Sequence, residues 1–219
     1  YIVEIDPEDP TSTPKKHTAM GRFKHEGANV IVAEDRRVVA YMGDDERNDY
    51  LYKFVSKNRI SSSRKKNMTL LSEGDLYVAR FRGDSPASQI DGSGKLPADG
   101  AFDGSGEWIA LTRHGRSVVP GMTTEEVLVY TRLAADKMGA TKMDRPEDVQ
   151  PSLRTGKIYV ALTNNSDRGK TSMVDEANPR TGNRFGHVLE MTERRGQAGT
   201  SFGWSILLQC GNPSDPSTY

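Results

Sequence analysis

The chain has 219 residues and carries 30 basic and 30 acidic side chains, so its formal net charge is zero. This balance gives no electrostatic reason to expect a nucleic acid or a membrane surface as a partner, and no apolar run approaches the roughly 20 residues of a membrane span. The 35% of hydrophobic residues, taken together with 21 glycines, is typical of a globular chain rich in strands and turns.

The first half of the chain consists mainly of short β-rich runs. Strands are predicted over residues 29–33, 37–42, 50–55, 76–81 and 107–112. The polar sequence Glu34-Asp35-Arg36 joins the first two runs and predicts a hairpin. The Gly/Asp/Ser-rich stretch from Gly83 to Gly106 is long for a connection in a compact domain, which favours a functional loop or an ordered insertion.

One segment has a helical pattern. Thr123 and Glu126 fit the two ends of a capping box. Apolar residues follow at helical spacing, and Gly139 stands where a helix would end. We therefore expect one amphipathic helix over about residues 123–138, inserted among strands.

Beyond this helix the strand pattern resumes and resembles the beginning of the chain. Each of the two similar units starts at a glutamate, Glu26 or Glu147, continues through paired β-rich runs and ends in a polar turn. The two glutamates are 121 positions apart, close to three repeats of the roughly 40–45 residues of a propeller blade. The spacing favours a β-propeller over a sandwich.

The sequence Arg145-Pro146-Glu147 places opposite charges beside a backbone restriction. Pro146 should force Arg145 into extended geometry, in which residues two apart share a face. A carboxylate there offers hard oxygen ligands to a cation, and the guanidinium offers a planar fork to a phosphate group. The alternative is that Glu26 and Glu147 each form a structural salt bridge with a neighbouring cation.

A second group of acidic residues lies between the second and third predicted strands. Asp44, Asp45, Glu46 and Asp49 do not have the spacing of an EF-hand loop. We interpret them as a solvated turn, with a peripheral calcium site as the alternative.

Several unusual strings occur in an order that resembles one known family. They are Val3-Glu-Ile-Asp-Pro7, Gly21-Arg-Phe-Lys-His-Glu-Gly-Ala28, Tyr41-Met-Gly-Asp-Asp-Glu46, Arg145-Pro-Glu147 and Gly186-His-Val-Leu-Glu190. In order and wording they are similar to the PhoX-type alkaline phosphatases, over most of the chain.

The resemblance implies a mainly β fold, a propeller that is six-bladed in the family. Residues 1–219 would form a single, partial propeller domain from the middle of the catalytic domain. It also implies export through the twin-arginine route to the periplasm or the exterior. The expected activity is the hydrolysis of phosphate monoesters with a cluster of iron and calcium at the channel mouth.

Carried over residue by residue, the resemblance implies that Glu26 and Glu147 are metal ligands and that Arg145 contacts the substrate phosphate. The family's cysteine ligand lies upstream of the strings seen here, so Cys210, the single cysteine of the chain, does not correspond to it. Further acidic ligands lie downstream, and the isolated chain would therefore lack part of the metal site.

Two other functions remain open at this point. The chain could belong to another calcium-dependent propeller hydrolase, a lactonase or diesterase, or to a propeller module that binds partners without turnover. An incomplete propeller would also leave sheet edges open, which predicts self-association.

Overall fold

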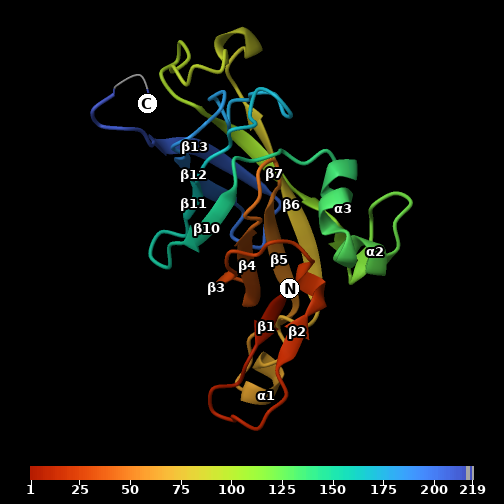
Figure 1. Ribbon diagram of the computed structural model, residues 1–219. Coiled ribbons are helices and arrows are strands. Elements are labelled where there is room, and N and C mark those ends of the chain that lie inside the picture. The colour runs from red at the N-terminus through yellow and green to blue at the C-terminus, as the bar shows by residue number, and fades with distance from the viewer. Residues whose placement is uncertain (216–217, 219) are drawn as a thin grey trace.

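The computed structural model describes residues 1–215 and 218, and strands make up most of its regular structure (Figure 1). The strands are β1 (Ile2–Glu4), β2 (Lys15–His17), β3 (Asn29–Val32), β4 (Arg37–Gly43), β5 (Leu51–Arg59), β6 (Gly74–Gly83), β7 (Asp103–Ala110), β8 (Thr112–Arg113), β9 (Arg116–Ser117), β10 (Pro146–Pro151), β11 (Ile158–Leu162), β12 (His187–Arg194) and β13 (Ser201–Gln209). The helices are η1 (Thr18–Met20), α1 (Arg64–Asn67), η2 (Ala87–Gln89), α2 (Thr124–Val129) and α3 (Thr131–Lys137). The prediction of a mainly β fold is confirmed, as is the hairpin formed by β3 and β4.

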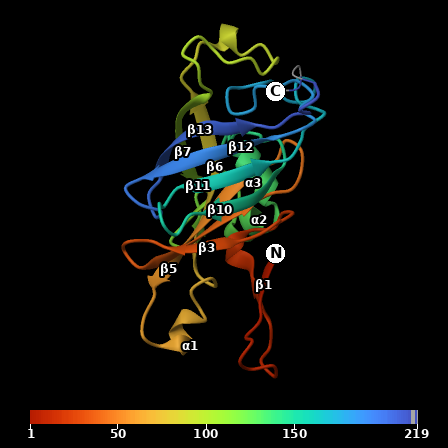
Figure 2. The same cartoon turned by 90° about the vertical axis from the view of Figure 1, so that its left-hand side faces the viewer.

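Nine strands form one antiparallel sheet in the order β10-β11-β12-β13-β7-β6-β5-β4-β3. The sheet curls until its two edge strands meet, so that β10 lies beside β3 and β4 (Figures 1 and 2). The Asn29 side-chain amide on β3 donates hydrogen bonds to Asp148 Oδ1 and to the Val149 carbonyl on β10, both at 2.9 Å. The two units that resemble each other in sequence are therefore neighbours in space.

Both faces of the central strands are buried, each in its own apolar core. On β4 the side chains of Val39 and Tyr41 enter the core between the two halves of the curled sheet. Ala40 and Met42, which alternate with them, enter a second core beneath α2 and α3. Figure 1 shows these helices and strands β10–β13 on opposite sides of β6 and β7. Strand β4 is thus held from both sides, which fixes the position of its end at Gly43.

The predicted single helix is instead two short ones. The capping box of Thr123 and Glu126 is present, as predicted. The chain leaves helical geometry at Tyr130, whose φ of −107° and ψ of 48° separate α2 from α3. Spacing alone could not locate this break, because Tyr130 continues the apolar period of the helix.

A buried ion pair crosses the first core. Lys53 Nζ on β5 lies 2.9 Å from Glu193 Oε1 on β12, and neither side chain is accessible to solvent to any extent. The same carboxylate oxygen accepts hydrogen bonds from the Tyr41 hydroxyl and the Trp108 indole. The pair therefore links the two halves of the sheet. Among the described residues, no helix combines the length and the apolar character needed to cross a membrane.

Candidate functional site

The candidate site lies where β4 ends and β10 begins. The backbone amide of Glu26 donates to the Gly43 carbonyl at 3.4 Å. On its other side, Gly43 packs so closely on the backbone that an added Cβ would overlap the carbonyl oxygens of Pro146 and Glu147. Glu26 and Glu147, which head the two similar units of the sequence, thus flank the same glycine.

Arg145 is in direct contact with two carboxylates. Its Nε and Nη2 lie 3.0 Å and 2.7 Å from Asp45 Oδ1, and Nη2 lies 3.4 Å from Glu147 Oε1. The prediction that Arg145 and Glu147 point the same way agrees with this geometry, but its premise was wrong. Arg145 has a φ of 56° rather than an extended conformation, a left-handed value that is uncommon and strained for a residue other than glycine.

The two glutamates differ in their surroundings. Glu147 is partly exposed and accepts a hydrogen bond from the Thr163 hydroxyl at 3.0 Å, in addition to its contact with Arg145. Glu26 is exposed, and no hydrogen bond or ion pair engages its carboxylate within the part of the chain that the structure describes. The sequence left open whether each glutamate is a metal ligand or forms a structural salt bridge. Among the described residues, Glu147 forms a salt bridge with Arg145, and Glu26 forms none.

A buried polar network fixes the residue before Arg145. Asp144 is inaccessible to solvent. One of its carboxylate oxygens accepts from Arg168 Nε at 2.8 Å and from the Asn165 amide at 2.9 Å, and the other accepts from the Asn183 amide at 3.0 Å. Saturated hydrogen bonding of a buried carboxylate restricts its backbone as well as its side chain, and this helps to hold Arg145 in its unusual conformation. Sequence reasoning gave these residues no role, since the partners are spread over 40 positions.

The acidic turn after β4 is not the solvated turn that the sequence suggested. Asp44 is buried. Its carboxylate accepts two hydrogen bonds from Arg132 of α3: Nε donates to Oδ2 at 2.8 Å, and Nη2 donates to Oδ1 at 2.5 Å. Arg132 Nε also lies 3.3 Å from Asp49 Oδ2. Burial, with the charge of Asp44 close by, raises the pKa of Asp49 to about 7. Asp44 binds Arg132 of α3, and the adjacent Asp45 binds Arg145. The turn therefore connects the helices to the candidate site.

The carboxylates at this site are of a type that suits a hard cation, although the oxygens of Glu26, Asp45 and Glu147 do not all lie within 4.8 Å of one another. Glu26, Asp45 and Glu147 supply carboxylate oxygens, which suit calcium and other hard cations, and the Glu26 carboxylate has no partner among the described residues that a metal would have to displace. Three carboxylates that lie within 4.8 Å of one another occur elsewhere, at Asp84, Asp103 and Glu176. There the Ser85 hydroxyl and amide already bind Glu176.

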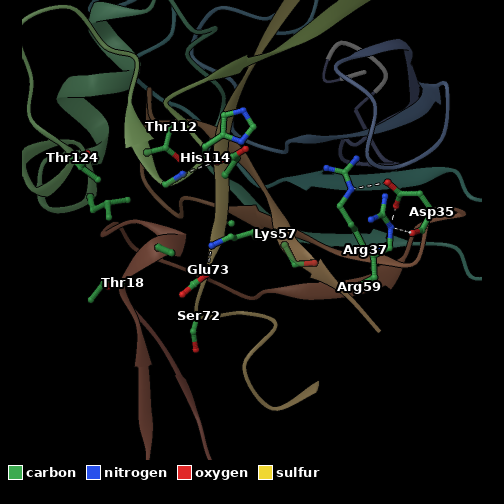
Figure 3. Close-up of a pocket in the computed structure, with 16 residues that line it drawn as sticks. Thr18, Asp35, Arg37, Lys57, Arg59, Ser72, Glu73, Thr112, His114 and Thr124 are labelled. Carbon is green, nitrogen blue, oxygen red and sulfur yellow. Dashed lines mark hydrogen bonds and ion pairs between the residues drawn. The ribbon is translucent and has the colours of Figure 1, made fainter. Parts of the chain in front are cut away.

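A cavity of about 620 Å³ lies at the other end of β4 from the candidate site. Figure 3 shows two ion pairs among the residues that line it: Arg37 with Asp35, and Lys57 with Glu73. Because these charged side chains already form ion pairs with each other, they are not held ready for a charged ligand. The size of the cavity alone does not identify it as the functional site.

Comparison with known proteins gives two matches to one family. The sequence model described as "Alkaline phosphatase PhoX" matches residues 1–218. The structure of Pseudomonas fluorescens PhoX in complex with vanadate, a transition-state analogue, superposes with a TM-score of 0.84 at 42% sequence identity. That match covers 99% of this chain and 37% of the other, so the chain spans little more than a third of its solved relative. No curated protein shows significant similarity to the chain. The strings noted in the sequence and the shared β-propeller fold therefore lead to one conclusion: the chain belongs to the PhoX family of alkaline phosphatases.

Proposed function

We propose that the protein hydrolyses phosphate monoesters with the help of bound metal ions, at the site formed by Arg145, Glu147 and Glu26. The observation that carries the proposal is the Arg145 guanidinium, held by Asp45 at 2.7 Å beside Glu147 in a partly exposed position. The solved relative is in complex with vanadate, a transition-state analogue, and membership of the alkaline phosphatase family supports the same reaction class.

Arg145 is the proposed phosphate-binding residue. Asp45 and Glu147 contact its Nε and Nη2, and Nη1 has no protein partner among the described residues. A guanidinium whose orientation is fixed in this way can direct its free N–H groups at the non-bridging phosphoryl oxygens, where negative charge is held in the transition state. The strained backbone at Arg145 is consistent with such a role.

Glu26 and Glu147 are the proposed metal ligands, and we propose calcium and iron as the metals. When bound, the metals would polarise the phosphoryl group and lower the pKa of an attacking water. Glu147 would then serve two purposes, since it also contacts Arg145 and so sets the distance between the guanidinium and the metal site. We further propose that the activity belongs to the whole protein, to which these 219 residues supply part of the metal-ligand set. We also propose that the enzyme works in the periplasm or outside the cell.

The experiment that tests these roles separates phosphate binding from metal binding. In the full-length protein, Arg145→Ala should lower kcat/KM for phenyl phosphate by about a hundredfold, as loss of one charge-stabilising donor does in other enzymes, while bound calcium and iron, measured by mass spectrometry, stay near the wild-type amounts. Glu26→Gln and Glu147→Gln should lower both metal content and rate.

The matched control is Arg80→Ala, which removes an arginine of similar exposure that pairs with Glu107 away from the site. It should leave both readouts at wild-type values. Full activity in Arg145→Ala would refute the phosphate-binding role, and wild-type metal content in both glutamate variants would make them structural. Turnover of lactones or phosphodiesters in preference to monoesters would redirect the proposal to another hydrolase.

A further inference from the structure

A groove of about 450 Å³ runs beside the candidate site, between residues 22–24 and residues 129–133 at the junction of α2 and α3. Its two walls are fastened together. The Arg22 amide donates to the Thr131 hydroxyl at 3.0 Å, and Gly21 packs on the same threonine so closely that a Cβ would meet it at 2.9 Å. The groove is thus part of the fixed structure rather than a gap between independent loops.

Aromatic stacking supports the wall formed by residues 22–24. The Phe23 ring lies between the rings of His25 and Tyr52, with centroid separations of 3.6 Å and 4.2 Å. Tyr52 is fully buried in the core beneath the helices. The inward-facing side chains of this segment are therefore anchored, and Arg22, Lys24 and Glu26, which alternate with them, all remain exposed.

The helical wall presents apolar surface to solvent. Tyr130 and Leu133 are 53% and 56% exposed, and Val129 beside them is 37% exposed. The break at Tyr130 places this residue at the corner of the helix pair, where its ring borders the groove. Clustered exposed apolar side chains that line a groove are typical of a binding surface.

The charges around the groove leave one cation uncompensated. Arg132 is engaged by Asp44 and Asp49, and Lys24 is paired with Glu46. Arg22 is exposed, and no acidic side chain pairs with it in the part of the chain that the structure describes. A ligand that fits this groove would therefore combine an apolar body with a negative charge.

The groove adjoins Asp45, a residue of the proposed phosphate site. The Lys24 carbonyl accepts a hydrogen bond from the Asp45 amide at 2.9 Å, and the Asp45 carboxylate is the group that holds Arg145. Lys24 and Glu26 are both exposed. A molecule whose phosphate group binds at Arg145 would extend its remaining part along this segment towards Tyr130.

We propose that the groove is the subsite for the alcohol portion of the substrate, and that it selects phosphate monoesters whose alcohol is aromatic and carries a further negative charge. Tyr130 and Leu133 would contact the ring, and Arg22 would bind the second anionic group. This proposal rests on the proposed function, because it assigns specificity to the same site.

The test compares substrates rather than absolute rates. In the full-length, metal-loaded protein, the double variant Tyr130→Ser/Leu133→Ser should lower the ratio of kcat/KM for phenyl phosphate to kcat/KM for glycerol 2-phosphate by about tenfold, because contact with the ring is lost. Leu207→Ser on β13 removes an equally exposed leucine (57%) and should keep the wild-type ratio. Arg22→Gln should lower the preference for 4-carboxyphenyl phosphate over phenyl phosphate by about fivefold.

A binding measurement keeps this proposal separate from the proposed function. Calorimetry should show that the double variant loses affinity for phenylphosphonate relative to methylphosphonate, neither of which is hydrolysed. A protein without monoesterase activity that still shows this selective loss would refute the proposed function and retain the subsite. Unchanged selectivity in both assays would overturn the subsite, whatever the activity.

Discussion

Gly43 is the residue on which the candidate site depends most directly. Its missing side chain allows the end of β4 to lie against the carbonyl groups of Pro146 and Glu147 while its own carbonyl accepts from Glu26. This is a close approach of two backbones, the situation in which glycine is required for space rather than for flexibility.

We therefore expect Gly43→Ala to displace the start of β10 and to lower the free energy of unfolding by about 1–3 kcal/mol, the usual range for overpacking. Urea denaturation measures this change. Gly100→Ala serves as a control for side-chain addition alone, since nothing lies within 4 Å of its added Cβ, although its φ of 89° adds local strain. A Gly43→Ala protein more stable than Gly100→Ala would contradict the close approach.

His187 gives the fold a dependence on pH. The residue is buried and contacts the Ala177 carbonyl at 2.9 Å, and burial lowers its pKa to about 4 from an ordinary value of 6.5. Between these two values the unfolded chain binds a proton that the folded protein does not, so stability falls as the pH falls from 6.5 to 4.

The loss at His187 should reach about 3 kcal/mol over this window, at about 1.4 kcal/mol per pH unit. His187→Gln should flatten the dependence of the free energy of unfolding on pH between 6.5 and 4. The slope from His25, whose pKa burial also lowers to about 4, should remain. His114→Gln, at an exposed position, should leave the profile as in the wild type, and an unaltered slope in His187→Gln would argue against a neutral buried imidazole.

At this scale the sequence predicted one contact and missed its neighbours. The shared direction of Arg145 and Glu147 was predicted from their places on either side of a proline, a local relation, although the extended backbone assumed for Arg145 is not present. Asp45 lies 100 positions from Arg145 and sits in an acidic run, and no local pattern distinguishes a carboxylate that binds a distant arginine from one that faces water.

Among the elements, β5 and β12 are joined by a contact that hydrophobic pattern could not have predicted. Lys53 donates to Glu193 and to the carbonyl groups of Gln197 and Gly199, and its ammonium lies 4.6 Å from the centre of the Trp108 ring. An unpaired ammonium or carboxylate is very costly to bury in an apolar core, and the ion pair between Lys53 and Glu193 offsets part of this cost.

Lys53→Met should therefore destabilise the protein by about 3–5 kcal/mol, because it leaves the Glu193 charge buried without its counter-ion. The double variant Lys53→Met/Glu193→Gln should recover part of this loss. A double-mutant cycle measured by urea denaturation tests the coupling, and additive losses in the two single variants would show that the pair is not coupled.

The strands themselves were largely predictable, since the alternation of apolar and polar residues and the polar turns between them are local properties. Their ends were less so, and the break at Tyr130 depends on how α2 and α3 fit against the sheet. The propeller repeat was inferred from two similar units, which in the structure stand at the two ends of the nine-stranded order and lie side by side because the sheet curls.

For the whole molecule, the main feature is the meeting of the two sheet edges. The predicted self-association assumed that these edges were open, yet β3 and β10 lie against each other with side-chain hydrogen bonds between them. Association of the protein with itself remains a prediction, and light scattering tests it. The exposed ends of β13, with Leu207 and Leu208, are now the better candidates for such a contact.

The contact between Asn29 and Asp148 closes a loop of 119 positions. Contacts of such long range form late, because the entropy of the intervening chain must be lost before they contribute anything. Arg145 stands immediately before β10 and Glu26 three residues before β3, so we expect the candidate site to form only when these two strands meet. A molecule in which the contact opens transiently would keep most of its strands and lose the site. In the full-length protein, the proposed phosphatase activity should therefore be the first property to disappear in mild denaturant and the last to return on refolding, which activity assays beside circular dichroism would measure.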